Sequence, residues 1–200
     1  MDNYEYIIAS LPDISEGWRP DSDEDRMEEL LGFIRENCSK ADNTLIDSLL
    51  AGFDEGKLDL AFYQGALKSR DRFIREYFNF DLRVRNAKVI YLNKALGRPE
   101  KQDIFLEPEG EFSEKERLEA ILGCGDILKR ERGIDAMTDE KIRELTVFDY
   151  FDIDAVLGFI ARFRIVQRWL CLDEEEGRKL FRKLVEDVRG SYEGVHYDEK

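Results

Sequence analysis

A chain of 200 residues is long enough to bury a hydrophobic core without disulfides or a structural metal. Hydrophobic residues make up 42% of it and aromatic residues 12%, which argues against an intrinsically disordered chain although 38% of the residues are charged. The formal net charge of −14 repels phosphate backbones, so nucleic acid is not expected as a partner of the whole molecule.

The N-terminal part predicts two amphipathic helices after an ambiguous opening. Tyr4–Leu11 is short and apolar and ends at Pro12, so it fits either a short strand or the first turn of a helix. Acidic residues followed by apolar residues at helical spacing predict a helix over 23–37. A shorter helix is expected over Asn43–Phe53, capped by Asn43 or Asp42.

The middle of the chain predicts two consecutive helices or one bent helix. An apolar stripe at the helical period runs over Leu58–Phe78, and the pattern resumes over Asn79–Leu96. Asn79 and Asp81 mark the expected break between the two segments. The second segment ends at Gly97, which is followed closely by a proline.

A connecting loop and two short helices are expected next. Residues 99–112 are rich in Pro, Glu and Gly, which is typical of a loop. A helix capped by Ser113 should follow and bend at Gly123 and Gly125. Another short helix is predicted over Thr138–Phe148, with Thr138 as its N-cap.

The C-terminal part predicts the most buried helix, over Ile153–Cys171 and capped by Asp152, followed by a terminal helix. The polar residues 191–200 should form a mobile tail. We therefore expect an all-α fold, with one short N-terminal strand left open. Its irregular bundle of about 7–8 helices should form two lobes, 1–98 and 113–190.

The expected lack of a secretory leader and of a membrane span favours a cytoplasmic protein. No basic segment leading into an apolar run follows Met1, so we expect no secretory leader. Charges interrupt even the richest apolar run, Phe148–Leu172, which leaves no stretch of roughly 20 apolar residues for a membrane span. Membrane contact is therefore expected only through partners. The cysteines Cys38, Cys124 and Cys171 lie too far apart for a zinc motif, and we expect reduced core thiols.

Few residues suggest catalysis. The single histidine, His196, lies in the predicted tail, and no glycine-rich phosphate loop occurs. Asp149, Asp152 and Asp154 are spaced so that they could bind a divalent cation or act as acid and base, but helix starts also select such residues, and capping is favoured. We expect no cofactor and no metal. An enzyme that uses these carboxylates alone ranks last among the hypotheses.

One basic segment, residues 61–98, stands out in an acidic protein. It carries 9 basic and 3 acidic residues, whereas residues 1–60 carry 5 basic and 16 acidic residues. One interpretation is a solvated face with internal ion pairs to the acidic helices. The other is a surface for an acidic partner, which clustered arginines interleaved with aromatic residues suit.

Two stretches resemble the d-type (also called C-type) subunit of rotary V/A-type ATPases. In Phe73–Gly97, as in a segment typical of that family, an aromatic-rich run leads to an acidic residue, an Asn, basic residues and a closing Leu-Gly. Phe151–Leu184 resembles the family's late helix with a charged face, which a short turn and a terminal helix follow. The opening Tyr4–Pro12 is similar to that of a short, otherwise uncharacterised bacterial family found with V-type ATPase gene sets. The positions that match in the first stretch are Asp81, Asn86, Lys88, Lys94, Leu96 and Gly97.

This resemblance implies an all-helical socket that receives the tip of the central shaft and rests on the membrane ring. Such a subunit is non-catalytic, couples the shaft to the ring in proton or sodium transport, and sits at the inner face of the membrane through its partner subunits. Members of the d-type family are commonly close to twice this length, with three related lobes, so this chain would supply part of that arrangement. The alternative is a small helical chaperone or adaptor that binds a client peptide in an apolar groove. In the coupling hypothesis, the partner-binding residues are Arg75, Asp81, Arg83, Arg85, Asn86 and Lys88.

Overall fold

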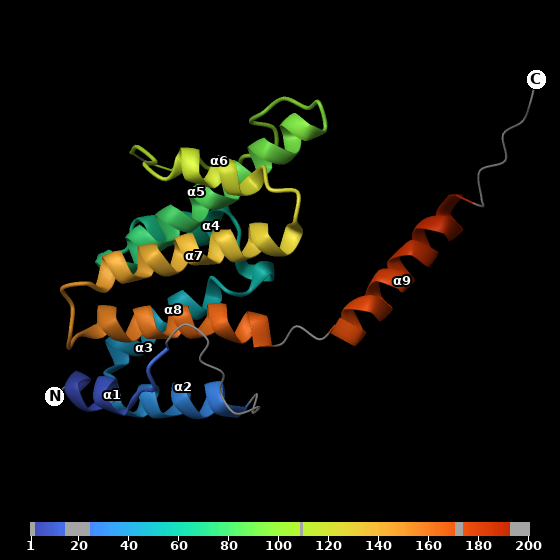
Figure 1. The fold of residues 1–200 in the computed structure, drawn as a ribbon. Coiled ribbons are helices and arrows are strands. Elements are labelled where there is room, and N and C mark those ends of the chain that lie inside the picture. Colours follow the sequence, from blue (N-terminus) through green and yellow to red (C-terminus); the bar gives the residue numbers. More distant parts are fainter. Residues whose placement is uncertain (1–2, 15–24, 109, 171–173, 193–200) are drawn as a thin grey trace, which may run out of the picture. The chain divides into compact units, whose positions relative to one another are not determined.

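The computed structural model describes residues 3–14, 25–108, 110–170 and 174–192, which form nine α-helices and one short 3-10 helix (Figure 1). No strand occurs among these residues, so the all-α prediction is confirmed and the ambiguous N-terminus is helical. The elements are α1 (Tyr4–Ser10), α2 (Asp25–Asn37), α3 (Lys40–Ala51), η1 (Glu55–Lys57), α4 (Leu60–Leu67), α5 (Arg72–Ala95), α6 (Lys115–Leu122), α7 (Ile127–Thr146), α8 (Ile153–Leu170) and α9 (Glu174–Tyr192).

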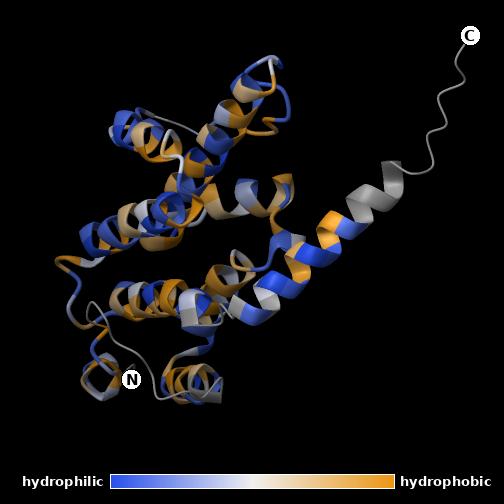
Figure 2. Ribbon diagram, turned by 45° about the vertical axis from the view of Figure 1, so that its right-hand side comes forward, coloured by the Kyte–Doolittle hydropathy of each residue, from blue (hydrophilic) through white to orange (hydrophobic). Residues whose placement is uncertain are grey.

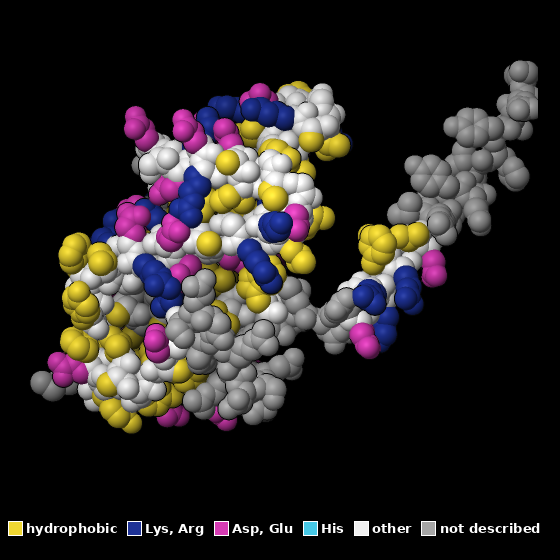
Figure 3. Space-filling model, in the orientation of Figure 1, with side chains coloured by type: hydrophobic (Ala, Val, Ile, Leu, Met, Phe, Trp, Pro, Cys, Tyr) yellow, Lys and Arg dark blue, Asp and Glu magenta, His cyan; other side chains and the backbone are white. Residues whose placement is uncertain are grey.

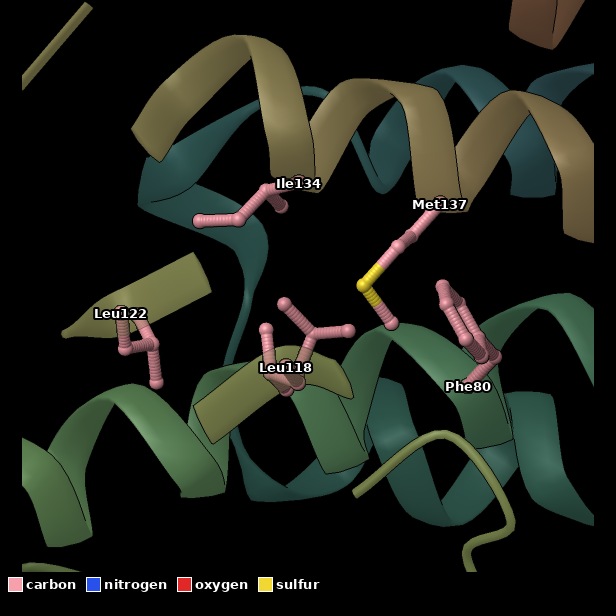
Figure 4. Close-up of a cluster of buried hydrophobic side chains, with 6 residues drawn as sticks. Phe80, Leu118, Leu122, Ile134 and Met137 are labelled. Carbon is pink, nitrogen blue, oxygen red and sulfur yellow. The ribbon is translucent and has the colours of Figure 1, made fainter. Parts of the chain in front are cut away.

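The chain divides into two compact units, Met1–Arg164 and Ile165–Lys200. Within the first unit α5 is the central helix, because it contacts α3, α4, α6 and α7. Its buried residues Phe80 and Val84 share one core cluster with apolar residues of α6 and α7 (Figure 4). Helices on both sides of the 99–112 segment therefore pack together, and the described part of that segment is not helical.

The start of α3 differs from the prediction. Ser39 is its N-cap: the hydroxyl accepts a hydrogen bond from the Asp42 amide at 3.2 Å, and the Asp42 carboxylate accepts one from the Ser39 amide at 3.0 Å. This is a reciprocal capping box. The predicted caps Asp42 and Asn43 were wrong because both already lie within the first turn. Asp42 also accepts from the Tyr4 hydroxyl at 3.0 Å, which joins α1 to α3.

The single helix predicted over Leu58–Phe78 is also wrong, since it is divided between α4 and α5. Asp71 caps α5, and its carboxylate accepts from the Ile74 amide at 2.8 Å. The Ser69 hydroxyl accepts from the Asp71 amide at 3.2 Å. Ser and Asp here bind nearby backbone amides, which favours a turn and a new helix start over continuation of the helix.

The break predicted at Asn79 and Asp81 does not occur, and α5 runs through both residues. The Asp81 carboxylate is engaged by the side chains of Tyr63 and Arg85. An Asp whose side chain has such partners does not compete for backbone hydrogen bonds, so it is tolerated inside a helix.

The helices that follow the loop begin at other residues than predicted. Glu114, not Ser113, is the N-cap of α6, without a side-chain capping bond. Gly123 ends α6, so the predicted bend is a break between two helices. The start predicted at Thr138 was wrong: Asp126 caps α7 through the Lys129 amide at 3.1 Å. Thr138 lies within α7 and donates to a backbone carbonyl of the preceding turn.

The predicted cap of α8 is confirmed, and one face of the helix is buried, although α5 contributes more buried residues. The Asp152 carboxylate accepts from the Ala155 amide at 3.2 Å. α8 approaches α7 closely at Gly158, where a Cβ would lie 2.7 Å from the Thr146 methyl group. Fully buried apolar residues line α8: Val156, Leu157, Ile160 and Ala161.

Two of the three cysteines are less buried than predicted. Cys38 and Cys124 are half-buried, not core residues, and Cys171 lies outside the described residues. Ser191 and Tyr192, which were predicted to belong to a tail, are the last residues of α9, and the rest of the predicted tail, with His196, lies outside the described residues. In the ranges that the structure describes, no helix combines the length and the apolar character needed to cross a membrane.

Candidate partner-binding surface

Two of the residues expected to bind a partner, Asp81 and Arg85, form a part-buried polar triad with Tyr63 between α4 and α5. The Asp81 carboxylate accepts hydrogen bonds from the Tyr63 hydroxyl at 2.5 Å and from Arg85 Nε at 2.7 Å. Burial raises the pKa of Tyr63 above its usual range, and Asp81 raises it further. Burial lowers the pKa of Arg85, but the charge and hydrogen bond of Asp81 raise it by more. The triad therefore fastens α4 to α5 as a charged, hydrogen-bonded unit.

Two more predicted residues hold the connecting segment against α5. Arg83 donates to the Glu111 carbonyl, and its guanidinium lies 5.6 Å from the centroid of the Phe112 ring. Asn86 donates to the Leu106 carbonyl at 2.9 Å. Contacts to backbone carbonyls and to an aromatic ring thus hold the described part of the segment against α5.

Arg75 and Lys88 also have partners within the chain. Arg75 donates to the Ser69 carbonyl at 3.1 Å and to Glu76 at 3.2 Å, next to the start of α5. The Lys88 ammonium lies 3.7 Å from a carboxylate oxygen of Glu131 on α7. Internal ion pairs thus involve Arg75, Arg85 and Lys88, whereas the contacts of Arg83 and Asn86 described above are to backbone carbonyls and an aromatic ring. Their binding to an external partner stays a prediction.

Arg72 belongs to the basic segment but was not among the predicted partner-binding residues, and it joins α5 to both sides of the α7–α8 turn. One guanidinium nitrogen donates to the Leu145 carbonyl at 2.6 Å, to Asp154 at 3.1 Å and to Asp149. Asp154 is buried. Burial raises its pKa to about 6, helped by the nearby carboxylates of Asp71, Asp152 and Asp149 and opposed by Arg72.

These aspartates serve structure in two ways. Asp152 caps α8, as the capping interpretation predicted, while Asp149 and Asp154 share one arginine. In the part of the chain that is described, no group of three or more His, Cys, Asp or Glu residues is placed to hold a metal ion. The hypothesis of a metal site at Asp149, Asp152 and Asp154 therefore gains no support from their geometry.

The titration of Asp154 gives a testable pH dependence. Because its folded-state pKa of about 6 exceeds the ordinary value of 3.8, the folded protein binds this proton more tightly than the unfolded chain does. The group therefore adds to the free energy of unfolding below its folded pKa, and this addition is lost as the pH rises through 6. From about pH 7.5 to about pH 5, wild type should gain about 1 kcal/mol relative to Asp154→Asn. Urea denaturation of both proteins at each pH measures this difference, and parallel pH profiles would contradict it.

Four large apolar side chains are exposed at the turn between α7 and α8. We call this cluster, Val147, Phe148, Tyr150 and Phe151, the α7–α8 tip. Phe148 is 86% exposed and Tyr150 69%. Figure 3 shows hydrophobic side chains gathered at the left edge of the molecule, where Figure 1 places this turn. Sequence reasoning treated Phe148 as the end of a helix and so missed the tip; three aromatic residues within four positions were its signal.

A second exposed apolar surface lies in the C-terminal unit. Leu180, Phe181 and Leu184 of α9, which we call the α9 stripe, are each more than half exposed. They recur at the helical period among charged residues, as Figures 2 and 3 show along α9. A helix of this kind is amphipathic and leaves its apolar side uncovered within its own unit.

Comparison with known proteins shows that part of the chain is similar to a family of unknown function. Residues 105–191 match a family model described as a protein of unknown function (DUF2764). No curated protein and no solved structure matches the chain. The matched residues include both the α7–α8 tip and the α9 stripe, so the two exposed apolar surfaces lie where the chain is similar to that family.

Proposed function

We propose that this protein is a non-catalytic subunit of a rotary V/A-type ATPase, which couples the central shaft to the membrane ring during proton or sodium transport. The described residues of the two stretches that resemble the d-type subunit of these enzymes lie mostly in helices. Phe73–Gly97 coincides with α5, the central helix of the first unit, and Phe151–Leu184 extends over α8 and into α9. The resemblance therefore concerns the helices that organise the fold.

The observation that carries the proposal is the exposure of the α7–α8 tip. Protein surfaces seldom gather several large apolar side chains, and those that do are commonly binding sites. Aromatic residues are also the favoured anchors of protein interfaces. A coupling protein needs such contact area and no catalytic groups. The exposed tip thus supports a role in an assembly, and it would be the surface through which the proposed subunit contacts its partner.

The basic segment has a narrower role in this proposal than the sequence suggested. The predicted residues on α5 stabilise the chain through their internal partners, while Lys68, Arg70 and Arg98 are exposed. Exposed cations of this kind steer an acidic partner and mainly affect the association rate. The apolar contacts would then supply most of the affinity.

Deleting the gene in the native organism tests the function directly. Membrane vesicles from the deletion strain should retain ATP hydrolysis by the catalytic head but lose most ATP-driven ion transport, because the shaft no longer turns the ring. Complementation with the wild-type gene should restore transport, which controls for effects on neighbouring genes. Full coupled transport in the deletion strain would overturn the proposal. Binding of the purified protein to unrelated unfolded peptides would then favour the chaperone or adaptor alternative.

A further inference from the structure

The α7–α8 tip has a definite chemistry, and we propose that it inserts into an apolar pocket bordered by Lys or Arg residues on a partner protein. This inference rests on the proposed function, within which the pocket belongs to another component of the rotary ATPase. Beyond that function, the inference names the α7–α8 tip as the docking surface and a basic-rimmed apolar pocket as its receptor.

The tip presents its apolar side chains to the outside. Besides Phe148 and Tyr150, Phe151 is 58% exposed and Val147 about half exposed. Phe148 keeps most of its ring uncovered within the chain, although the preceding turn of α7 contains the buried Leu145. Removing such rings from water favours association, and a flat surface would cover them poorly. A concave apolar receptor therefore fits the tip best.

The backbone that carries these side chains is held on both sides. The Asp149 amide donates to the Thr146 carbonyl at 3.1 Å, which closes the last turn of α7. Asp152 caps the start of α8, and Arg72 binds both the Leu145 carbonyl and the Asp149 carboxylate. A tip with a fixed backbone loses less conformational entropy on binding than a flexible loop does. The rings are thus presented in a preorganised arrangement.

The aspartates next to the tip, which we call its base, indicate the kind of partner that it binds. The carboxylates of Asp71, Asp149 and Asp152 all lie near that of Asp154, and the Arg72 guanidinium pairs with two of the four, Asp149 and Asp154. An excess of negative charge beside exposed rings disfavours an anionic lipid surface, which repels carboxylates. The same excess is complementary to Lys or Arg at the rim of a protein pocket. The charge therefore favours a basic-rimmed protein pocket over a membrane.

Photo-crosslinking in the native cells tests this directly. The photoreactive residue p-benzoylphenylalanine is placed at position 148, where exposure leaves room for it, and at position 128 as a control. Leu128 is also exposed, at 59%, but it lies near the start of α7 at the other end of the helix. After irradiation, the crosslinked peptides are mapped by mass spectrometry. The expected result is one specific adduct from position 148, on an apolar segment with Lys or Arg close by, and none on that segment from position 128.

The outcomes separate the inference from the proposed function. An adduct on a rotary ATPase protein with a basic-rimmed apolar segment supports both. The same kind of segment on an unrelated protein supports the docking inference and overturns the proposed function. Adducts on lipid alone, on a segment with acidic neighbours, or no specific adduct would each overturn the docking inference, whatever the fate of the function.

A matched pair of variants gives a quantitative check on the partner found. Phe148→Ser combined with Tyr150→Ser should weaken its binding at least about tenfold, because both rings leave the interface. Ile127→Ser combined with Leu128→Ser removes exposed apolar side chains elsewhere and should leave binding unchanged. Unchanged thermal unfolding in both variants confirms that the fold is intact. Equal losses of binding in the two pairs would refute the docking role of the tip.

Discussion

Leu118→Ala should lower the free energy of unfolding by about 3 kcal/mol. Leu118 is 0% exposed and lies at the centre of the cluster formed by α5, α6 and α7. Figure 4 shows it between Phe80 and Met137 on one side and Leu122 on the other. Truncation removes buried methyl groups and leaves a cavity that three rigid helices cannot fill. Urea denaturation measures the change.

Leu128→Ala is the matched control, since it removes the same atoms from a side chain that is 59% exposed at the start of α7. It should change the free energy of unfolding by no more than about 0.5 kcal/mol. The contrast tests whether the segments before and after the 99–112 loop share one core. A loss at Leu118 as small as that at Leu128 would contradict this packing.

Arg72→Ala should destabilise the protein by about 2 kcal/mol at neutral pH, because it leaves the buried Asp154 without its cation and removes the donor to the Leu145 carbonyl. Arg72→Lys should recover only part of this loss. A single ammonium cannot reproduce the guanidinium contacts to Leu145, Asp149 and Asp154 together. Thermal and urea denaturation of both variants give the comparison.

The control for this experiment is Arg75→Ala, one turn further along α5, whose partners are the Ser69 carbonyl and an exposed Glu76 carboxylate. It should cost less than Arg72→Ala. The pH adds a second test: Arg72 lowers the pKa of Asp154, so its removal raises that pKa further and more Asp154 is protonated at about pH 5. The penalty of Arg72→Ala should therefore shrink in acid. A constant penalty across this range would show that the ion pair contributes little.

Much of the helical content follows from the sequence, but several helix starts do not. Hydrophobic periodicity located α2, α3 and α8, because each places one apolar face against the core, and it predicted helical structure over α4 and α5 but misplaced the boundary between them. Capping rules were less decisive at α7, where the start lies at Asp126 and not at Thr138. Many Ser, Thr and Asp residues satisfy the local rule. Which of these residues becomes the N-cap depends on where the preceding helix ends and on what the following helix packs against.

The contacts at the candidate partner-binding surface could not be predicted without the tertiary structure. Arg72 and Asp154 are 82 positions apart, so no local pattern pairs them. Likewise, Asn86 donates to the Leu106 carbonyl and Lys88 lies near Glu131, and no local pattern predicts either contact. Three aromatic residues within 148–151 were a sequence signal of the tip, but an aromatic residue at the end of a helix is usually buried, so the exposure of Phe148 was not predicted.

The most direct measurement is affinity purification of the tagged full-length protein from its native cells at low and at high salt, with the bound proteins identified by mass spectrometry. The account predicts that shaft and ring proteins of a rotary ATPase are recovered at both salt concentrations, because apolar contacts supply most of the affinity. Some loss at high salt is expected if exposed cations or the acidic base of the tip contribute. Recovery of diverse unrelated proteins with no ATPase component among them would contradict the account.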